Sequence, residues 1–201
     1  MTNNKLYSQN SEESYIVDYF KNKKSGKFMD IGGFNPFMFS NTRKLYEIGW
    51  DGIIVEPSPT CFKSFIDEYE GNDRIALLNI AVGDTTDHIK FYESEGDAVS
   101  TTDIDHKNKW AKCGVPYREI TVPIMETESF FNTYCKGVDF LSIDTESTNM
   151  GIFRRIPSWV WESISCICIE HDGAYVEIKG TLVDYGLIEI YRNAENIICA
   201  K

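Results

Sequence analysis

Two acidic residues end successive apolar runs of the sequence, and a glycine pair follows the first of them. Asp30 precedes Gly32 and Gly33, and Glu56 comes 26 residues after Asp30. This spacing is that of one β-α-β unit, which puts both carboxylates at neighbouring strand ends. The first suits an ammonium group and the second suits the hydroxyls of a ribose, while glycine admits a ligand close to the backbone. The pattern predicts a site for a nucleoside with an amino-acid part.

The glycine pair lacks the pattern that holds a pyrophosphate. A dinucleotide fingerprint, Gly-x-Gly-x-x-Gly, places the diphosphate on a helix N-terminus. Here Gly32 is followed by Gly33, Phe34, Asn35 and Pro36. A nicotinamide-dependent dehydrogenase is therefore the weaker alternative, and adenosine without phosphates fits better.

Three later strand ends carry further candidates. Ala81 and Val82 are expected to hold an adenine by backbone and apolar contact. Asp144 follows a fourth strand and His171 follows a fifth. Histidine titrates near neutral pH and suits the removal of a proton from a hydroxyl or an amine. We therefore expect His171 to act as the base beside Asp144, or Asp144 itself if the histidine faces solvent.

A divalent metal bound by Asp144, Glu170 and His171 is an alternative use of the same rim. Oxygen and imidazole ligands suit such ions, but the spacing of these three residues is not that of an established motif. We predict no metal site.

Alternating helical and extended segments position these residues. Ser58 is expected to cap one helix, with Pro59 in its first turn. Predicted helices cover 11–22, 40–49, a segment from 58, 127–135 and 175–186, and the stretch 148–156 is expected to be helical or irregular. Predicted strands cover 27–31, 52–56, 75–82, 138–143, 163–170, 187–192 and 196–201. Period-two alternation between 86 and 124 indicates a small antiparallel excursion.

The strand pattern predicts an α/β fold. Continuous apolar strands separated by helices are typical of a parallel sheet that is covered on both faces. The last two strands, joined by a turn at 193–195, predict a closing hairpin in which one edge strand is antiparallel. A chain of 201 residues suits a single domain over 1–201. Ligands of such sheets bind beyond the carboxyl ends of the strands.

Composition limits which partners the protein is expected to bind and in which cell compartment we expect it. The net charge of −11 opposes binding to phosphate backbones, although a local basic patch at Lys21, Lys23, Lys24 and Lys27 stays open. The apolar runs are too short to span a membrane, and the N-terminus lacks a signal-peptide pattern. The six cysteines include no Cys-x-x-Cys pair, so we expect them reduced and structural. We predict a cytoplasmic protein without nucleic-acid or membrane partners.

The order of several blocks resembles a known family. These are YSQNSEESYI, FMDIGGFNP, SNTRKLYEIGWDGIIVEPSP, LLNIAVGD, STTD and VDFLSIDTES. Together they are similar to the FkbM-type methyltransferases over nearly the whole chain. The resemblance implies a Rossmann-like class I methyltransferase fold with a mostly parallel seven-stranded sheet and an antiparallel edge hairpin. It also implies S-adenosylmethionine as the methyl donor and, most often, a hydroxyl of a sugar or small metabolite as the acceptor.

The resemblance assigns cofactor contacts to Asp30, Gly32 and Glu56, and extends the site to Gln9, Ser40 and Asn41. With the strand-end candidates, the predicted cofactor contacts are Gln9, Asp30, Gly32, Gly33, Asn35, Ser40, Asn41, Glu56, Pro57, Ala81, Val82 and Asp144. Two positions depart from the family pattern. Pro36 replaces a usual glycine, and in the Asp-x-Glu-Gly-x-Glu motif Ser147 and Asn149 replace the glycine and the last acid.

The departures keep open a non-catalytic protein that binds S-adenosylmethionine or S-adenosylhomocysteine as a regulatory or structural subunit. We expect the excursion, with Trp110, Tyr117 and Arg118, to form a lid or acceptor surface. Trp159 and Trp161 lie two residues apart and suit either the core or a homodimer contact.

Overall fold

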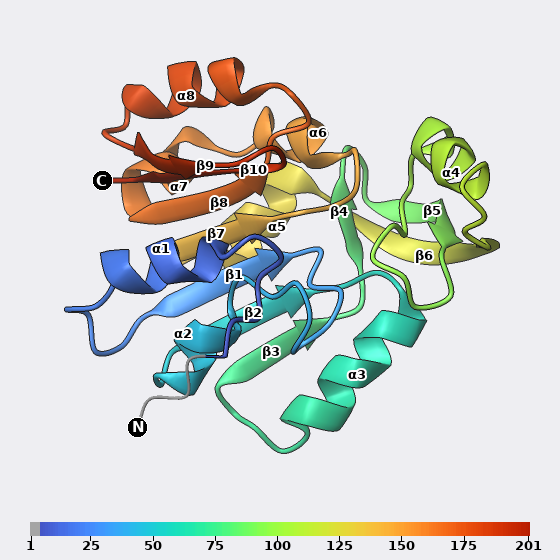
Figure 1. Cartoon of the computed structure of the whole chain (residues 1–201), viewed down its shortest axis with the longest axis horizontal. Coiled ribbons are helices and arrows are strands. Elements are labelled where there is room, and N and C mark those ends of the chain that lie inside the picture. Colours follow the sequence, from blue (N-terminus) through green and yellow to red (C-terminus); the bar gives the residue numbers. More distant parts are fainter. Residues whose placement is uncertain (1–4) are drawn as a thin grey trace.

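The computed structural model describes residues 5–201 as a sheet between two layers of helices. The first four residues of the predicted domain lie outside the described part. The main sheet has seven strands in the order β3-β2-β1-β7-β8-β10-β9. Its strands are β1 Lys27–Ile31, β2 Asp51–Val55, β3 Ile75–Leu78, β7 Phe140–Ile143, β8 Cys166–Glu170, β9 Ile188–Arg192 and β10 Asn196–Ala200. The predicted α/β class, the seven strands and the mostly parallel pairing are confirmed (Figure 1).

Strand alternation divides the core into two clusters, one on each face of the sheet. On β1, Met29 and Ile31 belong to one cluster and Phe28 to the other, because successive side chains point to opposite faces. The first face packs against α5 Thr127–Tyr134, α6 Asn149–Phe153, α7 Ser158–Ser163 and α8 Tyr175–Val183. The other packs against α1 Glu12–Tyr19, α2 Arg43–Glu47 and α3 Pro59–Tyr69. Cys166 and Cys168 are buried in this second cluster.

The closing hairpin forms the edge of the sheet, as predicted. Strand β10 pairs antiparallel with both β8 and β9. The antiparallel strand is therefore one position in from the edge, and the edge strand β9 runs in the same direction as β8.

The predicted strand 75–82 is wrong as a single element. Strand β3 ends at Leu78, and β4, Ala81–Gly83, joins a second sheet of three strands in the order β4-β6-β5. Asn79 stabilises the break, because its side-chain amide donates to the carbonyls of Glu56 (2.7 Å) and Pro57 (3.1 Å).

The second sheet is the predicted excursion, and it contains a helix that the sequence did not indicate. Its other strands are β5 Asp87–Glu93 and β6 Arg118–Glu126, and helix α4, Ile104–Ala111, lies between them in the chain. Asp103 caps α4 by accepting from the His106 N–H at 2.7 Å. Figure 1 shows this small sheet and α4 projecting beyond the carboxyl end of the main sheet.

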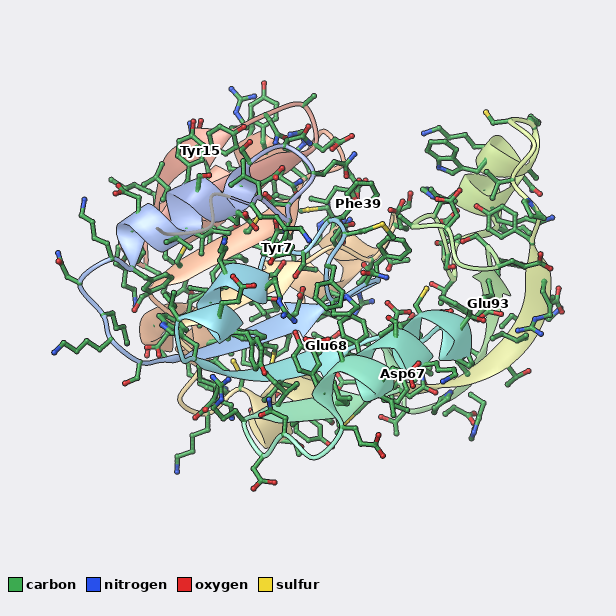
Figure 2. The ribbon with its side chains drawn as sticks, turned by 60° about the horizontal axis from the view of Figure 1, so that its bottom comes forward. Tyr7, Tyr15, Phe39, Asp67, Glu68 and Glu93 are labelled. Atoms are coloured by element: carbon green, nitrogen blue, oxygen red, sulfur yellow. The ribbon has the colours of Figure 1, made fainter. Side chains whose placement is uncertain are left out.

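The predicted cap of α3 also connects the two sheets. Ser58 Oγ accepts from the Cys61 N–H at 3.2 Å and donates to Glu93 Oε1, on β5, at 2.7 Å. Burial alone would raise the pKa of Glu93, but hydrogen bonds from Ser58, Arg118 and Thr60 hold it at about 2. Figure 2 shows Glu93 on the part of the excursion that lies next to α3. The carboxylate is therefore a charged anchor for the small sheet.

Trp161 is a core residue, which removes it from the predicted homodimer contact. Its ring is 5.2 Å from that of Phe153 and is buried. Trp159 is half-buried, and its indole N–H donates to Asn132. Within residues 5–201, no helix is long and apolar enough to cross a membrane.

Replacing Ser58 with alanine should destabilise the fold by about 2 kcal/mol or more, since it removes a helix cap and a hydrogen bond to a buried carboxylate. Urea unfolding at pH 7 measures this change. Ser64→Ala is the matched control on the same helix, because that hydroxyl donates only to the Cys61 carbonyl, and we expect it to change stability by under about 0.5 kcal/mol. Equal effects of the two variants would contradict the assigned link.

Candidate functional site

Two adjoining cavities open beyond the carboxyl ends of β1, β2 and β7. The first lobe comprises about 580 Å³ of space and the second about 430 Å³, in each case including space that is open to solvent. Both lobes are lined by Gly32, Phe34, Ala98, Asp144 and Glu146. The first lobe adds Ile31, Val55, Glu56, Pro57, Cys61, Ile80, Ala81, Val82, Phe91, Asp97, Ser100, Thr102, Thr145 and Thr148. The second adds Gln9, Asp30, Gly33, Phe39, Asn41 and Ser142.

Gly32, which lines both lobes, lets the turn after β1 pack closely against the loop after β7. Its φ is +87°, and a Cβ built on it would lie 1.7 Å from the Asp144 carbonyl oxygen. At Gly33, a Cβ would lie 2.7 Å from Ile54 Cγ2. We expected these glycines to make room for a ligand. The structure shows that they first make room for the loop after β7 and for the neighbouring strand.

Glu56 belongs to the first lobe and is only 5% exposed. Its Oε2 accepts from the Phe34 N–H at 2.8 Å and its Oε1 from the Ser58 N–H at 2.7 Å. Burial raises the pKa of Glu56 to about 7, against the lowering effect of these two hydrogen bonds. Each carboxylate oxygen keeps a further lone pair for a ligand hydroxyl.

Asp30 belongs to the second lobe, at the end of the neighbouring strand. Its Oδ2 accepts from Thr42 Oγ1 at 2.7 Å. Burial raises the pKa of Asp30 to about 6, while hydrogen bonds from Thr42 and Ser142 act in the opposite direction. Asn41 lies beside it and donates to Ser142 Oγ at 3.3 Å. The second lobe thus combines a buried carboxyl with amide and hydroxyl groups.

Asp144 lines both lobes and stands beside Glu170, the last residue of the neighbouring strand β8, just after the paired Ile143 and Ile169. Its Oδ1 is buried and has no hydrogen-bond partner. Burial, followed by the charges of Glu170 and Glu146, holds the pKa of Asp144 well above its usual range. Burial also raises the pKa of Glu170 to about 7. This buried oxygen thus lacks the hydrogen bond that a buried carboxylate oxygen normally accepts.

His171 does not line either lobe. The imidazole is 6% exposed and turned toward the closing hairpin. Its Nδ1 accepts from the Gly173 N–H at 3.0 Å, so Nε2 carries the proton and lies 3.3 Å from the Asn193 carbonyl oxygen. Both ring nitrogens are therefore used by the backbone, which leaves no free lone pair for a substrate proton.

The remaining predicted cofactor contacts divide into two groups. Gln9, Asn41, Pro57, Ala81 and Val82 line the lobes. Asn35 and Ser40 do not line them.

Both of these residues instead stabilise local turns. Asn35 Oδ1 accepts from the Phe37 and Met38 N–H groups, and Ser40 Oγ accepts from the Arg43 N–H at the start of α2. Their place in the candidate set followed the sequence blocks, which do not distinguish turn residues from ligand contacts.

The excursion, which we expected to form a lid or acceptor surface, lines the site through residues other than those we named. Asp97, Ala98, Ser100 and Thr102 line the first lobe, whereas Trp110, Tyr117 and Arg118 line neither lobe. No local pattern marks the four lining residues, because the sequence does not show which part of the excursion packs over the main sheet.

His106, on α4, joins the excursion to the loop after β7. Its Nδ1 lies 2.6 Å from Ser147 Oγ, and its Nε2 lies 3.1 Å from Glu146 Oε2. Thr101 Oγ1 donates to the Glu146 carbonyl at 2.7 Å. The φ of Ser147 is +77°, which explains why a glycine is the expected residue there. The serine accepts that strain and gains a contact with His106.

The second departure from the family motif, the asparagine in place of its last acid, also has a structural role. Asn149 donates from Nδ2 to Glu170 (2.6 Å) and Asp172 (3.1 Å), and its Oδ1 accepts from the Thr145 N–H. An acid at this position would place a third carboxylate against two others. In the part of the chain that the structure describes, no group of three or more acidic, histidine or cysteine side chains could hold a metal ion.

The mostly parallel sheet with a two-lobed cavity at its carboxyl edge defines a Rossmann-like α/β domain. Residues 30–188 match the family described as the methyltransferase FkbM domain. The chain therefore belongs to the FkbM methyltransferase family, and the family resemblance of its sequence blocks is confirmed. No curated protein matches the chain in sequence.

Two solved structures share the fold. The methyltransferase FkbM from Methylobacillus flagellatus KT has a TM-score of 0.56 and 10% identity, with 93% of this chain and 48% of that one covered. The putative RNA methyltransferase PH1948 from Pyrococcus horikoshii has a TM-score of 0.51 and 9% identity, with coverages of 95% and 80%. This chain thus spans about half the length of the first relative. At these identities the likeness shows the fold alone.

The buried carboxyl of Asp30 should make the protein less stable as the pH rises. The pKa of Asp30 in the folded state is about 6 against 3.8, so the folded state binds the extra proton. Its contribution is fully present below about pH 4 and is lost as the pH rises through 6, a change on the order of 3 kcal/mol. Asp30→Asn should remove this part of the pH dependence. Urea unfolding of both proteins between pH 4 and 7 measures it, and parallel curves would refute the assignment.

Proposed function

We propose that this chain is an S-adenosylmethionine-dependent methyltransferase that methylates a hydroxyl of a sugar or another small metabolite. The observation that supports it best is the two-lobed cavity, with Glu56 in one lobe, Asp30 in the other and Asp144 between them. S-adenosylmethionine has a nucleoside at one end and an amino acid at the other, so each end would occupy one lobe.

The residues present fit such a donor. The buried Asp144 Oδ1 lacks a partner, which suits a ligand that is cationic at its centre. We propose that Glu56 holds the ribose, Asp30 and Asn41 the amino-acid part, and Pro57, Ala81 and Val82 the adenine. When bound, S-adenosylmethionine supplies an electrophilic methyl group on a sulfonium.

Asp144 is the proposed base. Asp144 lines both lobes, which His171 does not, and its unpartnered Oδ1 would accept the proton of an acceptor hydroxyl. Because burial holds the pKa of Asp144 well above its usual range, this carboxyl is a stronger base than an exposed one once a cationic donor favours its ionised form. His171 then acts as a structural residue of the hairpin.

The charges support a small neutral acceptor over a nucleic acid. Neither lobe is lined by Lys or Arg among residues 5–201, and phosphate recognition depends on such groups. In the candidate basic patch, Lys21 pairs with Asp18 and Lys23 with Asp139. The six cysteines are unpaired, which supports a reducing compartment such as the cytoplasm.

S-adenosylhomocysteine should bind the protein in isothermal titration calorimetry, and NAD at the same concentration should not. Glu56→Ala should weaken S-adenosylhomocysteine about 10- to 100-fold, since it removes hydrogen bonds from a charged group. Glu128→Ala, at an exposed glutamate on α5, should leave the affinity unchanged. NAD binding, or no effect at Glu56, would contradict the proposal.

Replacing the base should reduce methyl transfer without loss of the donor site. Asp144→Asn should lower turnover by about 10²–10⁴-fold while S-adenosylhomocysteine still binds. His171→Ala should lower the melting temperature but reduce turnover by less than about tenfold. The measurement is transfer of labelled methyl to a set of hydroxylated sugars and metabolites. Binding without transfer to any acceptor would favour the non-catalytic alternative, and the reverse order of the two variants would make His171 the base.

A further inference from the structure

The walls of the donor cavity carry charge of one sign. The acidic side chains that line the two lobes are Asp and Glu carboxyls. No Lys, Arg or His lines either lobe within residues 5–201. The carboxyl residues are Asp30, Glu56, Asp97, Asp144 and Glu146. Such a cavity favours a cationic occupant over a neutral one of the same shape.

Asp144, which lines both lobes, has Glu170 as its acidic neighbour behind the cavity wall. Asp144 follows β7, and Glu170 is the last residue of the neighbouring parallel strand β8, so the two stand just after the paired Ile143 and Ile169. Asn149 donates to Glu170 Oε2, whereas Asp144 Oδ1 has no partner. Two adjacent buried carboxyls cannot both ionise cheaply, so the free protein retains a proton on the pair.

We infer that the Asp144–Glu170 carboxyl pair selects the sulfonium of the methyl donor over the neutral thioether of the demethylated product. Entry of the cation favours the doubly ionised pair, and the released proton passes to solvent. Loss of the methyl group removes the positive charge, after which the pair takes a proton back and the product binds less tightly. The inference rests on the proposed function and adds a means of product release.

Among residues 5–201, the neighbouring charges that shift the pKa values of the pair most are those of carboxyl groups. Asp30 on β1, Glu146 in the loop after β7 and Asp172 after β8 all add negative charge. His106 on α4 contacts Glu146 Oε2. His171 uses both ring nitrogens on the hairpin backbone. The positive charge that the pair lacks must therefore come from the ligand.

Calorimetry with S-adenosylmethionine and S-adenosylhomocysteine tests the inference without any acceptor. We expect the wild-type protein to bind the methylated ligand about tenfold more tightly. In Asp144→Asn the ratio should fall to about one to two, with the affinity for S-adenosylhomocysteine changed less than about threefold. Asp84→Asn removes the same charge from an exposed residue that lines neither lobe, and it should keep the wild-type ratio.

A second readout follows the proton. Titrations at pH 6.5 in two buffers with different ionisation enthalpies should show more protons released by S-adenosylmethionine than by S-adenosylhomocysteine, and Asp144→Asn should abolish the difference. If Asp144→Asn does not fold, Glu170→Gln carries the same expectations. Equal wild-type affinities, or a ratio that survives both variants, overturn the inference alone. Failure of both ligands to bind overturns the proposed function itself.

Discussion

The site depends on the close approach of two strand ends. Gly32 leaves β1 with a φ of +87°, and the Asp144 carbonyl occupies the space that any Cβ would need. Gly32 and Gly33 donate to the Val55 carbonyl, which also ties the turn to β2. This contact brings the carboxyl-bearing ends of β1, β2 and β7 around one cavity. A side chain at position 32 would separate them before it met any ligand.

That contact gathers carboxyl groups that are costly to bury as ions. Asp30, Glu56, Asp144 and Glu170 all have raised pKa values, with burial as the largest cause. Folding alone gains nothing from such a concentration of like groups. A cationic ligand with hydroxyl and ammonium donors would relieve it. The same crowding that weakens the free protein at higher pH would thus favour binding of the proposed donor.

The excursion completes the cavity through contacts at its two sides. Glu93 accepts from Ser58 at the start of α3, and His106 contacts Glu146 and Ser147 after β7. Between these anchors, Ala98 lines both lobes. The backbone of Ser147 is left-handed, at a position where the family pattern has glycine. The contact of Ser147 with His106 at this second anchor accounts for the serine.

Local patterns in the sequence determined the sheet, most of its helices and the strand-end carboxylates, because apolar periodicity and turn chemistry act over a few residues. They also supported the Ser58 cap and the closing hairpin, whose antiparallel strand proved to lie one position inside the edge. They did not show that the chain leaves the sheet after Leu78, since an asparagine side chain decides that break through contacts 22 and 23 residues away. The sequence patterns also did not predict helix α4, because it lies in a region that was interpreted as alternating with a period of two.

Tertiary structure alone decided which of the candidate residues share a cavity. Asp144 and His171 have the same standing in sequence, at the ends of neighbouring strands, yet one faces both lobes and the other bonds the hairpin backbone. Asn35 and Ser40 bond backbone groups two or three residues away, so local turns hold their side chains and the cavity does not include them. The direction of a side chain at a strand end depends on what the next loop packs against. For His171 that partner is the carbonyl of Asn193, 22 residues away in the closing hairpin.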